Sequence, residues 1–489
     1  MKMGLFNTAR LRTLSEFFSK LKFEKIVSVL RHSVGHELAG LIIVGVLLRI
    51  ALMPYFSSPY DASAYCSGLT WFMNGYSPYA FSASIYPPLV YFLFFPLFSL
   101  AKWMGLSPAY QIIPEAANTG TVTGLISAYQ VNPTFLVLWK IPILCFDVLT
   151  GLLIYYFAKI LAHNSKMPKW CFAIWFFNPF TLTVSYIHGA YDVIAAFFIL
   201  LGAFFVYKQN YFSGGLSFGL GTLTKLSPIY TAFPIAAVLL FGILNSSRKD
   251  FKISVFGFLR FVGGFFVPLL ALAPMAIEYF QRMSEWMAHE ASISGGLNQW
   301  FFAVDLRAGW KFVNSNLGII QKGFLYYPLI VLVMCLLVCK LLKWNSERSS
   351  KNVLIVAALF TALIYFFTAT TVQPQYLVWI LPLLIALSSM RREFFLPLGV
   401  LSFAGLAFLL SIQGPYAVLY PLASHTLLYS PGQVSNHILQ YVNTTGIIGP
   451  YLWRDLCLIF GGIGFLGLVL TVLFTVNGLR HGRLIVDEE

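Results

Sequence analysis

The sequence predicts an all-α, polytopic membrane protein of about twelve transmembrane helices, with a long first outer loop that contains a re-entrant or interfacial helix. Hydrophobic residues make up 58% of the 489 positions, which is more apolar surface than a water-soluble domain can bury. Charged residues make up only 10% of the chain, and they separate apolar stretches long enough to cross a bilayer. Basic residues cluster between those stretches, which is typical of cytoplasmic turns.

The formal net charge of +14 does not indicate nucleic-acid binding, because the chain has no basic, aromatic-interleaved soluble domain. Anionic membrane lipid or a phosphate-bearing substrate would accommodate the same charge. The six cysteines show neither a disulfide framework nor a metal-type spacing with histidine. Membrane lipid is therefore an expected partner, and nucleic acid is not.

Residues 1–37 are predicted to form an amphipathic, basic segment on the cytoplasmic face, because lysines and arginines alternate with apolar residues there. Residues 38–476 are predicted to form one transmembrane domain, and 477–489 a cytoplasmic tail. The first span, 38–56, runs from inside to outside. The other predicted spans are 134–160, 170–187, 193–207, 213–226, 228–244, 253–275, 323–342, 353–370, 377–389, 395–412 and 453–476.

The apolar segment 87–104 is predicted not to cross the membrane. If it did, Lys166 and Lys169 would lie on the outer side, against the charge rule. The segment is short and begins with two prolines, which favours a re-entrant or interfacial helix. Irregular backbone at membrane depth is tolerated where protein or a water-filled cavity covers it. Residues 57–133 therefore read as one outer loop.

Asp61 is the first candidate for chemistry, because it follows the first span and lies in an aromatic-rich stretch that includes Tyr86. A carboxylate there can accept a proton from a sugar hydroxyl, and aromatic rings can stack on sugar faces. The alternative is a solvated aspartate that caps a short helix.

The segment from His188 to Asp192 forms a very short predicted outer turn. Two ionisable groups beside an apolar wall are a candidate site. Equally, Asp192 can be the N-cap of the next helix, and His188 an interfacial residue with satisfied hydrogen bonds.

Lys225 lies in a break between two apolar runs, at the predicted outer side and away from any cytoplasmic turn. A lysine ammonium there can hold a phosphate as a point charge. The alternative is a lysine that extends its stem along apolar surface.

Gln375 and Tyr376 precede a short helix at the outer face, where an amide can bind sugar hydroxyls. A proline-containing turn explains the same residues. Lys140 and Asp147 lie two turns apart in the second span and share a face. Since buried charges are usually paired, we expect these two to pair with each other in a structural role.

Taken together, the motifs resemble the glycosyltransferase C superfamily of polyprenyl-phosphate-sugar-dependent enzymes over most of residues 38–390. The motifs that carry the resemblance are Asp61 with the later segment 86–89, the turn 188–192, the segment 225–228 and the segment 375–379. The last two are most similar to GPI mannosyltransferase I and its prokaryotic relatives. The order of the motifs along the chain and their shared predicted side strengthen the resemblance.

The resemblance implies a polyprenyl- or dolichyl-phosphate sugar donor, most simply of mannose, and a glycan, glycolipid or protein acceptor. It also implies a plasma-membrane location in a prokaryote or the endoplasmic reticulum in a eukaryote. The eukaryotic GPI enzyme has an Asp-x-Asp motif, whereas this chain has Asp61 and then Ser63. No cofactor is therefore firmly expected, and a divalent metal stays open.

The resulting hypothesis is an inverting hexosyltransferase. Asp61 is the catalytic general base, Lys225 binds the donor phosphate, and the remaining candidates bind substrate, namely Tyr86, His188, Asp192, Gln375 and Tyr376. The main alternative is a transporter or flippase of a lipid-linked or small polar substrate, since broken helices near ionisable residues also mark transporters. A weaker alternative is a non-catalytic scaffold subunit.

Overall fold

The computed structural model describes residues 36–80, 86–106, 110–112, 129–131, 133–162, 164–244, 251–293, 352–367, 374–414 and 450–481. The chain divides into two units, Met1–Leu48 and Arg49–Glu489. Helix α3 (His36–Leu52) begins in the first unit and ends in the second. Most of the predicted cytoplasmic segment 1–37 and of the tail 477–489 lies outside the described residues, so those domain boundaries stay predictions.

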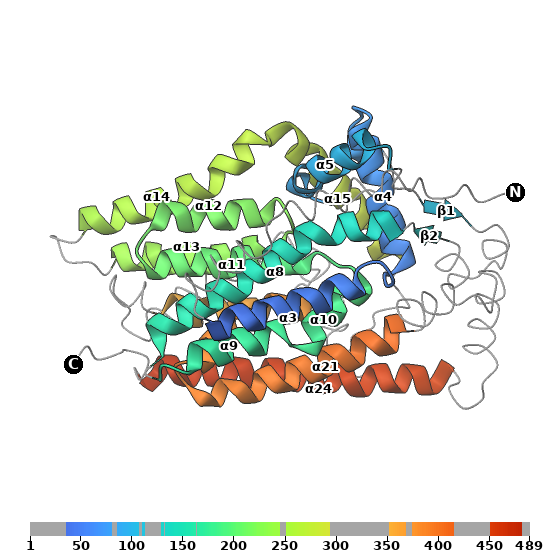
Figure 1. Cartoon of the computed structure of the whole chain (residues 1–489). Coiled ribbons are helices and arrows are strands. Elements are labelled where there is room, and N and C mark those ends of the chain that lie inside the picture. Colours follow the sequence, from blue (N-terminus) through green and yellow to red (C-terminus); the bar gives the residue numbers. More distant parts are fainter. Residues whose placement is uncertain are drawn as a thin grey trace, which may run out of the picture. The chain divides into compact units, whose positions relative to one another are not determined.

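The described part of the second unit is almost entirely helical, as the composition predicts (Figure 1). Its long or apolar helices are α4 (Pro59–Met73), α5 (Pro88–Trp103), α8 (Pro133–Leu161), α9 (Met167–Phe176), α11 (Asp192–Tyr207), α12 (Tyr211–Thr222), α13 (Ser227–Leu244), α14 (Phe251–Ala271), α15 (Ala273–Ile293), α19 (Val353–Phe367), α20 (Leu381–Ser388), α21 (Phe395–Gly414) and α24 (Pro450–His481). Short helices are α10 (Pro179–Leu182), η1 (Pro78–Ala80), η2 (Thr183–His188), η3 (Pro374–Trp379) and η4 (Arg392–Phe394). Strands β1 (Tyr110–Ile112) and β2 (Tyr129–Val131) pair antiparallel, with Gln111 opposite Gln130.

Among the described residues, six helical segments are long and apolar enough to cross a membrane, and four shorter apolar segments accompany them. This confirms the predicted class of an all-α polytopic membrane protein. Each predicted span that falls on described residues contains a helix, although the spans 38–56 and 213–226 end in turns and the span 170–187 is interrupted at 177–178. The predicted span 323–342 lies outside the described residues, so the total of about twelve helices stays a prediction.

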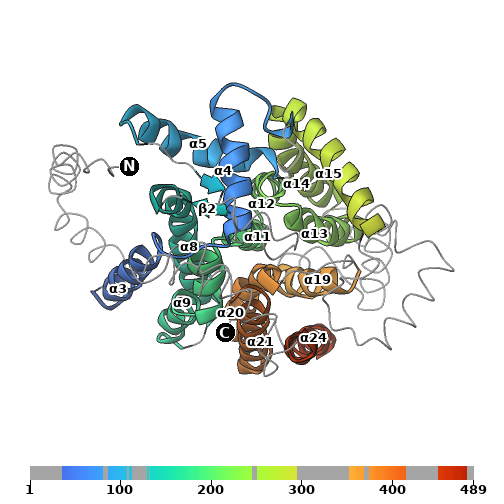
Figure 2. The same ribbon diagram turned by 90° about the vertical axis from the view of Figure 1, so that its right-hand side faces the viewer.

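The helices α4, α5 and α15 lie across one end of the bundle, which we call the outer end. In Figure 2, which looks at that end, they run across the view, whereas α21 and α24 are seen end-on. Helix α5 is one of the shorter apolar helices, and its 16 residues match the predicted non-crossing helix at 87–104. Helix α4 has 15 residues. It is longer than the short helix that the sequence suggests near Asp61.

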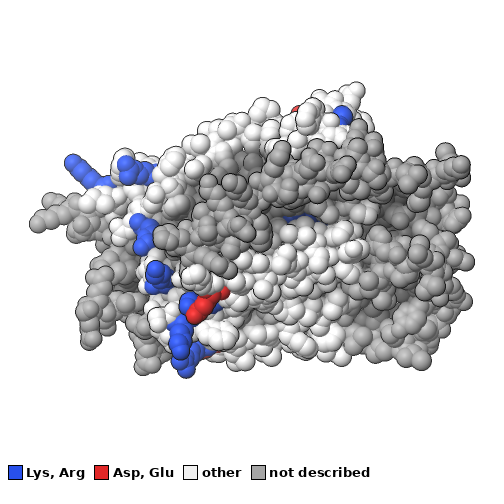
Figure 3. Space-filling view, in the orientation of Figure 1, with Lys and Arg blue, Asp and Glu red and all other residues white. Residues whose placement is uncertain are grey.

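Positive side chains on the face shown in Figure 3 gather mainly at the opposite end of the bundle. Helices α14 and α21 begin at that end (Figure 1). Such a distribution is expected where basic turns remain in the cytoplasm. The outer end is therefore the side on which the sequence places Asp61, the turn 188–192 and Lys225.

Helices α12 and α14 pack so closely that glycines are required at their contact. A Cβ atom at Gly215 would overlap the carbonyl oxygen of Phe261, and one at Gly264 would overlap that of Phe212. Small residues at such contacts let two membrane helices approach along their backbones. This packing fixes the position of α12, whose C-terminal end leads into the turn that carries Lys225.

We expect Gly215→Ala to lower the free energy of unfolding by roughly 1–3 kcal/mol, because a methyl group there must push the two backbones apart. The matched control is Gly263→Ala on α14, where a Cβ would meet no atom within 4 Å. Thermal unfolding of both variants in the same detergent measures the difference. Equal midpoints for the two variants would contradict the close-packing argument.

Candidate functional site

Asp61 lies in the first turn of α4, beside the side chain of His188. Asp61 Oδ2 is 3.1 Å from His188 Nε2. The Asp61 side chain keeps 29% of its surface exposed, whereas that of His188 keeps 1%. Neither ring nitrogen of His188 makes a contact with hydrogen-bond geometry among the described residues. An accessible carboxylate is thus backed by a buried imidazole that still has hydrogen-bonding capacity.

The surroundings hold the pKa of Asp61 below its usual value. Burial by itself raises this pKa, but the contact with His188, a hydrogen bond from Ser58 and the positive charge of Lys225 together outweigh it. Asp61 is therefore ionised at neutral pH. The contribution of Lys225 also means that its ammonium is near enough to act on the carboxylate.

His188 is presented by an unusual piece of backbone. It ends the π-helical segment η2, and Gly189 follows with a φ of 86°. Glycine adopts this left-handed conformation without steric cost. The amides of Gly189 and Ala190 both donate to the carbonyl of Val184. Short π-helical segments are frequent at functional sites, and this one aims the histidine across the turn at α4.

Lys225 and Asp192 form the second charged pair of the site. Lys225 Nζ is 2.5 Å from Asp192 Oδ1, and the indole nitrogen of Trp379 donates to the same oxygen at 2.8 Å. The ammonium also lies 4.6 Å from the ring centre of Tyr376 and 5.3 Å from that of Tyr191, at distances where aromatic faces attract cations. The Lys225 side chain keeps 20% of its surface exposed. Asp192 is the first residue of α11, while Tyr191 holds the N-cap position.

The segment that begins at Pro374 adds the last predicted candidates. The ring of Tyr376 stacks on Trp379 with centroids 4.5 Å apart. Gln375 Oε1 is buried and has no hydrogen-bond partner among the described residues. A buried amide oxygen without a donor is costly, so this atom is a free acceptor for a ligand hydroxyl.

Two backbone hydrogen bonds connect these segments. The amide of Ser58 donates to the carbonyl of His188 at 2.8 Å, and the amide of Leu89 donates to that of Leu223 at 2.9 Å. The Tyr86 ring packs against those of Tyr65 and Tyr191, at centroid distances of 4.6 and 6.0 Å. The structure thus brings every sequence-predicted candidate to the same end of the bundle. Their roles stay predictions.

Residues 39–292 match the family model described as GPI transamidase subunit PIG-U. The chain belongs to this family. The match covers more than half of the chain, and it contains Asp61, Tyr86, the turn 188–192 and Lys225.

Two curated relatives are GPI mannosyltransferases. The chain is 24% identical over 263 residues to GPI mannosyltransferase 1 of Kluyveromyces lactis, covering 51% of this chain and 54% of that protein. It is 31% identical over 142 residues to GPI mannosyltransferase 1 of Saccharomyces cerevisiae, covering 28% and 34%. The chain spans about half the length of the curated relatives it matches, or less. These similarities confirm the resemblance that the sequence motifs predict.

The sequence reasoning assigns no role to two tryptophans of the site, although Trp379 ends one of its motifs. Trp139 on α8 is stacked between Tyr65 and Phe94, at centroid distances of 4.3 and 3.9 Å. It thereby packs α4 and α5 against the bundle. Trp379 binds Asp192, as described above. The only signal in the sequence is their proximity to assigned residues, since Trp139 precedes Lys140 and Trp379 ends the motif that begins at Gln375.

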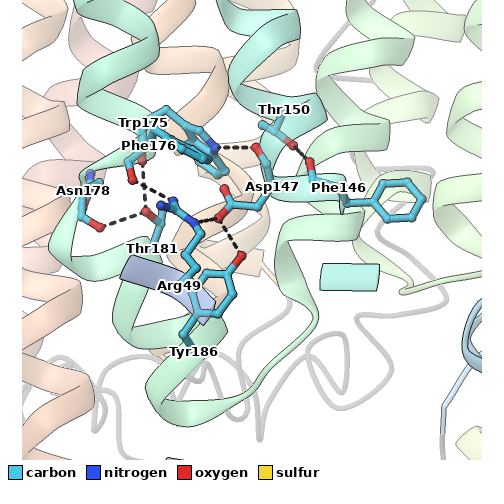
Figure 4. A network of polar contacts seen from close by, with 9 residues as sticks. All are labelled: Arg49, Phe146, Asp147, Thr150, Trp175, Phe176, Asn178, Thr181 and Tyr186. Atoms are coloured by element: carbon cyan, nitrogen blue, oxygen red, sulfur yellow. Dashed lines mark hydrogen bonds and ion pairs between the residues drawn. The ribbon is translucent and has the colours of Figure 1, made fainter. Parts of the chain in front are cut away.

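The predicted pairing of Lys140 with Asp147 is wrong. Asp147 Oδ2 is instead 2.7 Å from Arg49 Nε and accepts a hydrogen bond from the Tyr186 hydroxyl at 3.0 Å (Figure 4). The Arg49 guanidinium also donates to the carbonyl of Phe176 at 2.7 Å and lies over its ring. Lys140 binds backbone carbonyls. Partner choice here depends on which helices are neighbours, and a shared face of one helix does not decide it.

The described side chains do not gather into a metal centre. No group of three or more His, Cys, Asp or Glu residues gathers among them in a geometry that could hold an ion. The position of the second carboxylate of an Asp-x-Asp motif is Ser63. Asp192 already binds an ammonium and an indole N–H.

Proposed function

We propose that this protein is an inverting membrane glycosyltransferase that moves a sugar, most simply mannose, from a polyprenyl-phosphate donor to an acceptor hydroxyl at the outer face. The observation that carries the proposal is the accessible, ionised carboxylate of Asp61 beside the buried His188 and within electrostatic reach of Lys225. The similarity to two GPI mannosyltransferases supports mannose as the sugar.

In the proposed reaction the acceptor oxygen attacks the anomeric carbon in one displacement. Asp61 takes the proton from the acceptor hydroxyl as the new C–O bond forms. The bond from the anomeric carbon to the phosphate oxygen breaks, and the lipid phosphate leaves with the electron pair. The transition state has oxocarbenium character, as in other glycosyl transfers. A single displacement inverts the configuration at that carbon.

Lys225 supplies the charge that the leaving phosphate needs. Without a donor its ammonium is neutralised by Asp192. A phosphate brings a second anion to the exposed side of the same ammonium, and the rings of Tyr376 and Tyr191 hold the lysine in place. Gln375 offers its free carbonyl oxygen to a sugar hydroxyl. Tyr86 and His188 line the side of the site formed by α4.

The experiment is a transfer assay with the purified full chain in lipid nanodiscs. Radiolabelled polyprenyl-phosphate mannose, glucose and arabinose are offered separately, with a total membrane lipid and protein extract as the acceptor source. We expect label to move from the mannose donor only. A folded protein that transfers label from none of the three donors would contradict the proposal.

A second candidate function is a non-catalytic subunit, because the matching family is described as a GPI transamidase subunit. In that case the charged groups at the outer end would stabilise an assembly without reacting. A cellular complementation test separates the two functions. If the protein is a subunit, the Asp61→Asn variant still complements. If it is an enzyme, the variant fails to complement although it is as abundant in the cell as the unmodified protein.

The acid side of the pH–rate profile should depend on His188. Because the pKa of Asp61 is lowered, the base is active above that pKa, and the rate falls as the pH drops through it. His188→Gln removes one of the groups that lower the pKa, so the pKa rises and the acid limb moves to higher pH. The measurement is kcat/KM for the donor against pH. If the acid limb stays at the same pH in His188→Gln, His188 does not control the pKa of the base.

A further inference from the structure

Lys140, on α8, is fully buried, and its ammonium binds only backbone. Its Nζ donates to the carbonyl oxygens of Met53 at 3.0 Å and Tyr186 at 2.9 Å, and also to that of Phe56. A lysine ammonium carries three N–H donors, so all of them are used. None of the ion pairs of the described residues includes Lys140. Its charge therefore serves another purpose than neutralising an acid.

The three carbonyls belong to the two backbone segments that lead into the catalytic pair. Met53 and Phe56 lie between the end of α3 and the start of α4, which carries Asp61. Tyr186 lies two residues before His188, in η2. One ammonium thus binds the backbone segment that leads to Asp61 and the backbone segment that leads to His188.

Neighbouring hydrogen bonds also hold the turn at His188 in place. The Trp139 indole, next to Lys140 on α8, donates to the carbonyl of Gly189 at 3.0 Å. The amide of Ser58 donates to the carbonyl of His188. The turn that presents His188 is therefore held against α8 on one side and against the start of α4 on the other. The Ser58–His188 hydrogen bond joins the two segments directly, and Lys140 is the side chain that binds carbonyls of both from α8.

We propose that Lys140 is a positioning residue for the proposed base. It touches no substrate, and it sets the register between the segments 53–58 and 186–189, so that Asp61 and His188 meet at 3.1 Å. A buried charge at membrane depth is costly, and three simultaneous charged hydrogen bonds offset that cost. An apolar side chain of the same length would fill the space but leave three carbonyls without a donor. The kinetic part of the test rests on the proposed function, and the structural part does not.

The structural test uses an engineered disulfide that reports the register directly. A Cβ atom at Gly189 would lie 3.9 Å from Ser57 Cβ, within the range of about 3.5–4.5 Å found in disulfides. It would also lie 3.6 Å from Lys140 Cε, an ordinary contact that does not displace the lysine. The variant Ser57→Cys/Gly189→Cys is oxidised mildly, and the linked peptide is quantified by mass spectrometry. The single variant Gly189→Cys controls for the strain of a side chain at a φ of 86°, and the single variant Ser57→Cys controls for the exchange at Ser57.

We expect the cross-link to form readily with Lys140 present and at least about tenfold more slowly with Lys140→Met, because the loss of a single charged hydrogen bond already has about that effect and this variant loses three. Lys140→Arg should restore it, since a guanidinium also donates to several carbonyls. The matched control is Lys159→Met, an exposed lysine on the same helix. If Lys140→Met does not purify as a folded protein, Lys140→Gln carries the same comparison. Cross-linking that is independent of residue 140 would overturn the proposal.

The kinetic test compares pH–rate profiles. We expect the acid limb of Lys140→Met to move to higher pH, as for His188→Gln, and the double variant to move no further than either single one. Additive shifts would mean that Lys140 acts on something other than the Asp61–His188 pair. Lys140-dependent cross-linking in a chain without transferase activity would reject the proposed function while supporting the positioning role.

Discussion

Asp61→Asn should lower the rate of sugar transfer by about 10²–10⁴-fold, the typical contribution of a general base. Asparagine has nearly the same shape, but its amide cannot take up the proton of the acceptor hydroxyl. The side chain keeps 29% of its surface exposed, so the exchange should change the free energy of unfolding little. The measurement is kcat at saturating donor, together with the thermal midpoint of the purified variant.

The matched control is Glu278→Gln on α15, at the same end of the bundle. Glu278 is an exposed carboxylate that accepts a hydrogen bond from the Ser77 hydroxyl at 2.5 Å. Losing its charge should leave kcat near that of the unmodified protein. Turnover by Asp61→Asn that also remains near that level would refute Asp61 as the base and favour the subunit function.

Arg49→Met should destabilise the protein by roughly 3–5 kcal/mol, the cost of leaving one partner of a buried ion pair without the other. The Asp147 side chain is 1% exposed, and its Oδ1 already lacks a hydrogen-bond partner among the described residues. After the substitution, its Oδ2 keeps only the Tyr186 hydroxyl among the contacts shown in Figure 4. Chemical unfolding in mixed micelles measures the loss.

The double variant Arg49→Met/Asp147→Leu should recover much of that stability. Replacing both members of a buried pair with apolar residues is often neutral, because neither charge then has to be desolvated. Both variants lose the packing of Arg49 over Phe176. The difference between the single and the double variant therefore reports the unpaired charge of Asp147 and not this packing. Equal stability of the single and double variants would mean that the charge pair contributes nothing beyond packing.

The spans and the side on which each motif lies could be predicted from local pattern. Apolar length alone marks α8, α13 and α21, and Pro87 and Pro88 mark the start of α5. Basic turns then divide the segment ends into two groups, which puts Asp61 and Lys225 at the same end. These features follow from the cost of exposing backbone and charge to lipid, and that cost is paid segment by segment.

The sequence by itself therefore determined the membrane class, the helices on the described parts of the predicted spans, the short apolar helix α5 and the residues that gather at the outer end. Only the tertiary structure decided the partners: Arg49 for Asp147, three carbonyls for Lys140, and Asp192 with Trp379 around Lys225. The physical reason is distance. Hydrophobic periodicity tells which residues must leave the lipid, but a buried charge pairs with the group that helix packing brings within about 3 Å, and no single segment encodes that neighbour.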